Sequence, residues 1–197
     1  MVNIIFNASL ICYLLSGLGY TLYLVFRNSM VKQFSVYLLG LGLFSHTVTI
    51  SLRSIDTGHG PYTTGFEIAS FLAWVIVVIY FFIEFKYKIK DLGAFVIPVV
   101  FLILLFSAFQ SREFSLIDES TTMFWLTMHR TLSIIGYAAF AIAFGAAVMY
   151  LIQENQVKTK KLGVMYFRMP SLEVLDNLNY KVISIGFPLF TLGFMTG

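Results

Sequence analysis

The stretch IASFLAWVIVVIYFFIEF, residues 68–85, decides the fold because its only charged side chain is Glu84. A helix needs about 17–25 predominantly apolar residues to cross the hydrocarbon core of a bilayer. The whole chain has the same character: 58% of its 197 residues are hydrophobic, 12% are charged, and its mean hydropathy is +0.84. A soluble domain carries about 25% charged residues. The sequence therefore predicts an all-α, polytopic transmembrane helical bundle.

Five more apolar runs lie on either side of this stretch. The six predicted spans are residues 4–26, 35–52, 68–85, 92–109, 126–153 and 182–197. The first run lacks a basic start and an obvious cleavage site, so it is predicted to be a span rather than a signal peptide. Residues 1–197 are predicted to form a single integral membrane domain.

The charged residues of the connectors predict the orientation. Basic residues gather after the first, third and fifth spans: Arg27, Lys32, Lys86, Lys88, Lys90, Lys158, Lys160, Lys161 and Arg168. The other connectors carry mixed charges: Arg53, Asp56, Glu67, Arg112, Glu113, Asp118 and Glu119. Because Lys and Arg collect on the cytoplasmic side, we expect the N-terminus outside, in a plasma or bacterial inner membrane. The small net charge of +3 and its scattered basic residues favour membrane lipid, and not nucleic acid, as a partner.

The last predicted span is short, contains Pro188, and stops at Gly197 without a polar flank. A C-terminal membrane helix normally carries an interfacial anchor on its far side. We therefore expect the chain to be C-terminally incomplete.

The fifth span carries small residues at helical spacing. Ala139, Ala143 and Ala147 recur every four residues near Gly136, a spacing that predicts close helix packing.

His129 lies near the outer end of the fifth span, in FWLTMHRTLSIIGY. Imidazole is a common axial ligand of haem iron, so His129 is either a haem ligand or a hydrogen-bonded interfacial histidine. Gly136 lies seven residues on, on nearly the same face, where a flat ring can approach the backbone. Arg130 is expected to pair with a haem propionate or to extend toward lipid headgroups.

Of the other two histidines, His46 precedes the connector RSIDTGHGPYTTGFE, residues 53–67, and His59 lies within it. His46 lies inside the second span, where ionisable groups face the bundle interior, as part of a polar network or as a ligand or proton carrier. His59 is a weaker candidate than His129 for cofactor binding. It is flanked by two glycines, with a proline after the second, and is either solvated or in a turn that packs against another surface. Glu67 suits the N-terminus of the next helix, and Trp74 suits a membrane interface.

Several classes of chemistry have no motif here. The chain has no Walker loop, no HExxH and no dinucleotide fingerprint, so nucleotide-driven or hydrolytic chemistry is not expected. Cys12 is the only cysteine, which excludes an intramolecular disulfide and a CxxCH haem attachment site.

Four segments resemble the CcsA/ResC/CcmC-type cytochrome c assembly family, in family order. They are HTVTISLR (46–53), GHGPYTTGFEIASFLAW (58–74), MHRTLSIIGYAAF (128–140) and LDNLNYKVISIGFPLFTLGFMTG (175–197). In that family the last segment leads into an outer Trp-rich haem-binding segment. The resemblance covers most of the chain from His46 onward.

The resemblance implies cytochrome c biogenesis, in which haem is handled or presented at the extracytoplasmic face for attachment to apocytochrome c. It implies that His129 is one axial ligand of an outer haem, with the second axial histidine beyond residue 197. It implies no more enzymatic activity than that of a component of a cytochrome c haem lyase (synthetase) complex. The implied partners are another cytochrome c assembly membrane subunit and apocytochrome c.

Two alternatives to haem presentation remain open. The same family includes a HemX-like branch, so the chain can instead be a membrane regulator or scaffold without haem ligation. A transporter of another small molecule is also compatible with a polytopic bundle, because a fold does not fix a function.

Overall fold

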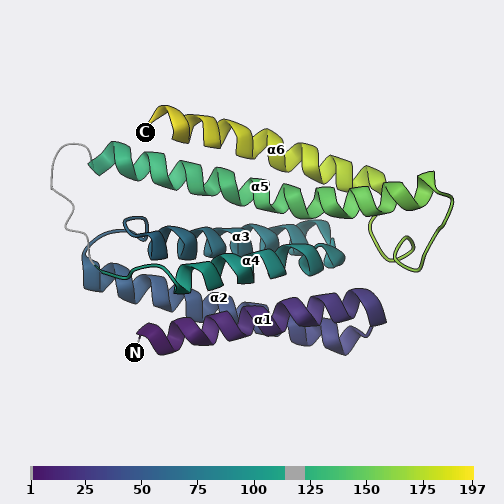
Figure 1. Ribbon diagram of the computed structural model, residues 1–197, viewed down its shortest axis with the longest axis horizontal. Coiled ribbons are helices and arrows are strands. Elements are labelled where there is room, and N and C mark those ends of the chain that lie inside the picture. The colour runs from purple at the N-terminus through teal and green to yellow at the C-terminus, as the bar shows by residue number, and fades with distance from the viewer. Residues whose placement is uncertain (1, 114–122) are drawn as a thin grey trace.

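The computed structural model describes residues 2–113 and 123–197. These residues form α1 (Val2–Phe26), α2 (Ser29–Thr57), α3 (Gly65–Tyr87), the short η1 (Lys90–Leu92), α4 (Gly93–Ala108), α5 (Met123–Lys158) and α6 (Leu172–Met195) (Figure 1). Within these residues, six helices are long and apolar enough to cross a membrane, which confirms the predicted multi-pass bundle. Asp118 and Glu119, two charges used in the orientation argument, lie outside the described residues.

Two helices begin earlier in the sequence than the apolar runs suggest, because their first turns are capped polar segments. Asn28 caps α2 by accepting a hydrogen bond from the backbone N–H of Met30. Ser171 caps α6 in the same way, through the N–H of Val174. The predicted start of the last span, residue 182, is therefore ten residues late, because the charged first turns of α6 resemble a connector in sequence.

The helices run antiparallel in a row, with α1 and α2 at one edge, α3 and α4 in the middle, and α5 and α6 at the other edge (Figure 1). The middle helices supply much of the core. Ile76, Val77 and Tyr80 of α3 and Ile97 and Val100 of α4 are fully buried.

The bundle has two chemically different ends. We call one the lysine-rich end, where α1, α3 and α5 finish, and the other the histidine end, where α2, α4 and α6 finish. Both chain termini lie at the histidine end (Figure 1). The basic connectors thus share one end, as predicted; which side of the membrane that end faces remains a prediction.

Polar contacts join distant parts of the chain at the lysine-rich end. Arg27 forms an ion pair with Asp91 at the start of η1. Arg168, in the connector before α6, donates to the carbonyls of Leu24 and Val25 at the end of α1. The last carbonyls of a helix have no partner within it, so Arg168 caps α1.

Helices α5 and α6 pack closely at glycine residues, with no room for a further side chain between them. A Cβ added to Gly136 would lie 2.6 Å from the Cβ of Phe190, and one added to Gly186 would lie 2.5 Å from the Cβ of Ala139. The close packing predicted from Gly136 and Ala139 is therefore confirmed, and the partner is α6. Lipid offers no hydrophobic force between helices, so such close contacts supply the attraction.

Replacing Gly186 by valine is expected to lower the free energy of unfolding by about 1–3 kcal/mol, the usual cost of overpacking a tight contact. The reason is the 2.5 Å separation between the new Cβ and that of Ala139. Thermal unfolding of the purified protein in detergent measures the change. Gly40→Val is the matched control, because a Cβ at Gly40 meets no atom within 4 Å. Equal melting of the two variants would contradict this packing.

Candidate functional site

The connector between α2 and α3 is a folded turn at the histidine end. Gly58 ends α2 in the left-handed conformation, with φ of 73°, where an L side chain is strained. Thr64 then caps α3: its side chain accepts from the N–H of Glu67, and the Glu67 carboxylate accepts from the N–H of Thr64. This reciprocal capping box fixes where α3 begins.

Glu67 is the centre of the polar cluster at this turn. The side chain is 2% exposed, and its Oε1 accepts from Nε of Arg53 at 2.6 Å. Its Oε2 accepts from the backbone N–H groups of Thr63 at 3.0 Å and Thr64 at 3.2 Å. Glu67 therefore does more than meet the helix dipole: it joins the last turns of α2 to the start of α3.

His59 packs against this cluster, with 15% of its side chain exposed. Its Nδ1 lies 2.9 Å from the carbonyl of Gly60 and 3.1 Å from Oγ1 of Thr63. The same nitrogen is 4.0 Å from Oε2 of Glu67. Of the two expectations for His59, this geometry matches the packed turn.

Tyr62 attaches the turn to α5. Its carbonyl accepts from Nη1 of Arg130 at 2.7 Å, and its hydroxyl accepts from Oγ1 of Thr127 at 3.0 Å. The structure thus gives Arg130 a backbone partner, a role that was not among those expected for it. These two bonds hold the turn beside His129, which follows Thr127 by two residues.

His129 is half-buried, and its Nδ1 lies 2.7 Å from the carbonyl of Gly193 near the end of α6. A carbonyl can only accept, so Nδ1 carries the proton, and the neutral ring keeps a lone pair on Nε2. Within residues 2–113 and 123–197, no hydrogen bond to Nε2 is found. Metal-binding histidines commonly donate their second N–H to a backbone carbonyl in this manner, which fixes the ring orientation.

The space beside Gly136 is already filled. A Cβ there would lie 2.9 Å from Cα and 3.0 Å from N of Phe190. The expectation that a flat ring approaches the backbone at Gly136 is therefore wrong. The smallness of this residue serves the contact with α6 instead.

His46 occupies a separate place, fully buried among α1, α2 and α3. Its Nδ1 lies 3.2 Å from the hydroxyl of Tyr13, and its Nε2 lies 2.8 Å from Oγ of Ser70. Both ring nitrogens are engaged, an arrangement that fits the polar-network hypothesis. Ser70, Glu67 and Arg53 help to line a cavity of about 10 Å³, which has room for about one water molecule.

Trp74 joins α2 to α3, with its Nε1 donating to Oγ1 of Thr47 at 2.8 Å.

Arg112 also belongs to this site, although the sequence indicated only that it is a charged residue of a connector. Its carbonyl accepts from Nη2 of Arg53 at 3.1 Å, and its guanidinium lies over the rings of Phe6 and Phe66. Burial lowers the pKa of Arg112 from its ordinary value, and the nearby charge of Arg53 lowers it further.

In the part of the chain that the structure describes, no three His, Cys, Asp or Glu side chains converge on one point. His129 thus offers one imidazole with a fixed tautomer, bound to the end of α6 and close in sequence to the residues that hold the Tyr62 turn. Such a group can supply one bond to a metal centre that brings its other ligands with it, as a haem does.

Comparison with known proteins gives the chain a family context. Residues 62–197 match the family model described as "Cytochrome C assembly protein". The chain is 28% identical to the "Cytochrome c biogenesis protein CcsA" of Guillardia theta, across 97% of this chain and 70% of that protein. Identity to the Chlorella vulgaris protein of the same name is 29%, across 80% of this chain and 60% of that protein.

A "Protein HemX" of Brevibacillus brevis is 26% identical, across 98% of this chain and 71% of its own length. No solved structure matches the chain.

Proposed function

Because the chain belongs to the cytochrome c assembly protein family, we propose that it serves cytochrome c biogenesis by handling haem at the histidine end of the bundle. This end is taken to face the extracytoplasmic side, in line with the positive-inside argument. Haem presented there is available for attachment to apocytochrome c. The matched relatives named for cytochrome c biogenesis support the role.

The geometry of His129 is the observation that carries this proposal. The Gly193 carbonyl fixes the proton on Nδ1 and leaves Nε2 as the ligating atom. A bound haem would supply an iron that an imidazole can ligate, and propionates that can accept hydrogen bonds from basic groups. The donor set at the histidine end fits that group: one imidazole, with the Arg130 guanidinium next to it in sequence and bound to Tyr62.

The chain's own residues orient the ligand from two sides. On one side, Thr127 and Arg130 hold the Tyr62 turn against α5. On the other side, the close packing of Gly136 and Gly186 fixes the register of α6, and with it the position of the Gly193 carbonyl. A second axial ligand, an assembly subunit and apocytochrome c are further parts of this proposal.

Deleting the gene is expected to remove covalent haem from c-type cytochromes while leaving non-covalent b-type haem unchanged. The reason is that the proposed role lies in delivery to the attachment site, not in the haem supply. Haem-stained gels of membrane proteins measure the first quantity, and pyridine haemochrome spectra of extracted haem measure the second. Expression of the full-length wild-type protein from a plasmid is the control and restores the stained bands.

Two other outcomes would speak against haem presentation. An equal fall in both kinds of haem would favour a regulator of haem supply. Unchanged haem staining of the c-type cytochromes would remove the chain from the attachment pathway altogether.

A further inference from the structure

Helices α2 and α3 stand apart along one stretch, and a polar contact between them borders this stretch at each end. Toward the histidine end, Trp74 donates to Thr47. At the lysine-rich end, Nζ of Lys32 lies 3.1 Å from Oε1 of Glu84, a carboxylate that also accepts from the hydroxyl of Tyr20. Between these contacts lies a groove of about 710 Å³.

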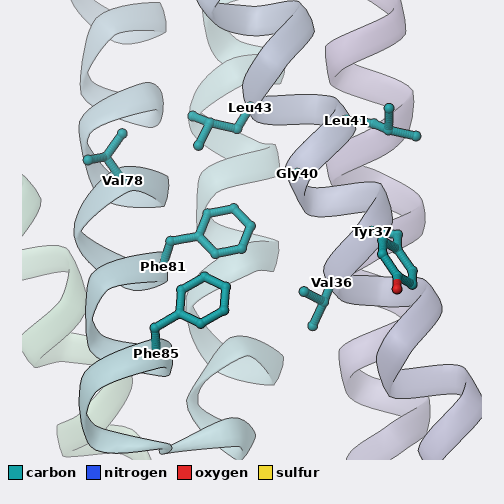
Figure 2. Close-up of a pocket in the computed structure, with 8 residues that line it drawn as sticks. All are labelled: Val36, Tyr37, Gly40, Leu41, Leu43, Val78, Phe81 and Phe85. Carbon is teal, nitrogen blue, oxygen red and sulfur yellow. The ribbon is translucent and has the colours of Figure 1, made fainter.

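The groove is apolar and open along its side. Figure 2 shows Phe81 and Phe85 extending from α3 toward α2, with Val36 and Leu43 on the facing side of α2. Gly40 leaves room at the middle of α2, where an added Cβ would meet no atom within 4 Å. In a membrane-spanning protein such a surface meets hydrocarbon chains, which are as apolar as leucine.

The depth of the groove corresponds to one leaflet. Val78 is the groove residue on α3 that lies farthest from the lysine-rich end. It precedes the end of α3 at Tyr87 by nine residues, or about 14 Å at 1.5 Å per residue. One leaflet contributes about 15 Å of the roughly 30 Å hydrocarbon core. A lipid of the leaflet at the lysine-rich end can therefore reach the whole groove.

Two lysines follow Phe85, the last groove residue on α3, at the lysine-rich end. Lys86 and Lys88 are exposed where α3 finishes, and among the described residues neither forms an ion pair with a carboxylate. The ammonium of Lys86 lies over the rings of Phe82 and Tyr87, at 5.1 and 5.7 Å, which holds it at the helix end. Basic sites between membrane helices on this side attract anionic headgroups.

We propose that the groove binds one anionic glycerophospholipid, with an acyl chain between α2 and α3 and its phosphate against Lys86 and Lys88. A partner helix fits less well. The apolar lining runs over eight residues of each helix, from Val36 to Leu43 and from Val78 to Phe85, or about 10 Å along each axis. A transmembrane helix is about 30 Å long and would meet both polar contacts.

The acyl-chain half of the proposal is tested with Gly40→Phe, which fills the groove from an open position. The full-length protein is purified in detergent, washed to remove bulk lipid, and analysed by native mass spectrometry after incubation with phosphatidylglycerol. We expect wild type to retain one lipid and Gly40→Phe to retain at least about tenfold less, since each displaced methylene weakens binding about fourfold. Leu22→Phe, at an exposed position of α1, is the control and keeps the lipid.

The headgroup half is tested with the double variant Lys86→Glu, Lys88→Glu. Its preference for phosphatidylglycerol over phosphatidylcholine is expected to fall at least about 25-fold, at about fivefold for each lysine charge removed. Lys161→Glu, an exposed lysine beyond α5 at the same end, keeps the preference. These exposed positions leave the core intact, so this test stands even where Gly40→Phe fails to fold.

Three results would overturn the proposal. The first is wild-type protein that retains no phospholipid, and the second is equal retention by wild type and both variants. The third is loss of a co-purifying membrane protein from Gly40→Phe with lipid unchanged, which would assign the groove to a partner span.

Discussion

Replacing His129 by alanine is expected to lower the haem occupancy of the purified full-length protein by more than about 100-fold. Loss of a group that only orients a metal ligand typically costs about 10–100-fold in affinity, and the ligand itself contributes more. His129 has two features that suit such a ligand: its tautomer is fixed by the Gly193 carbonyl, and among the described residues its Nε2 has no hydrogen-bond partner. The Soret absorbance per mole of protein measures the occupancy.

His59→Ala is the matched control for this experiment, because it removes an imidazole from the same end of the bundle. Its Nδ1 belongs to the turn around Thr63 and Glu67, so haem occupancy is expected to stay near that of wild type. Added imidazole is expected to restore a low-spin spectrum to His129→Ala. Identical Soret bands in wild type and His129→Ala would show that His129 is not the ligand.

Replacing Glu67 by alanine is expected to lower the free energy of unfolding by about 3–5 kcal/mol, the usual cost of breaking a buried ion pair from one side. The carboxylate is 2% exposed and bonded to Arg53, Thr63 and Thr64. Its loss leaves the Arg53 charge beside that of Arg112 and removes half of the α3 capping box. Chemical unfolding in mixed micelles, followed by tryptophan fluorescence, measures the change.

Glu67→Gln separates the two contributions of this side chain. A glutamine retains the capping geometry, since Gln also serves in a capping box, but it loses the charge that faces Arg53. Its destabilisation is therefore expected to lie between wild type and Glu67→Ala. If Glu67→Ala unfolds within about 0.5 kcal/mol of wild type, as a surface substitution does, the ion pair contributes nothing to the fold.

The spans were predictable because uninterrupted apolar runs of membrane length leave few other folds. The run at 68–85 and its five neighbours each coincide with a helix, apart from one or two residues at the ends of the fourth and the last run. The early start of α6 was not predictable from hydropathy, because LEVLDNLNYK carries charges that resemble a connector. Only the cap at Ser171 marks this segment as a helix. Hydropathy indicates which residues lie within the lipid, whereas a helix can extend past the membrane surface.

The contacts between residues of different helices were not predictable from the sequence. Arg53 and Glu67 were each noted, yet their pairing depends on how the turn between them folds. The role of Gly136 depends on the register of α6, which brings Phe190 to it. Sequence spacing places residues on one face of a helix, whereas the neighbour of that face is set by tertiary packing.

The capping of α1 by Arg168 has a consequence for biosynthesis. The helix and its cap lie more than 140 positions apart in the chain, so α1 leaves the ribosome long before the guanidinium that completes its end. Until then, water and lipid headgroups must satisfy the carbonyls of Leu24 and Val25. The contact can form only once α5 has entered the bilayer and the connector before α6 has emerged, so it marks a late stage of co-translational assembly, when the first and last thirds of the nascent chain come together.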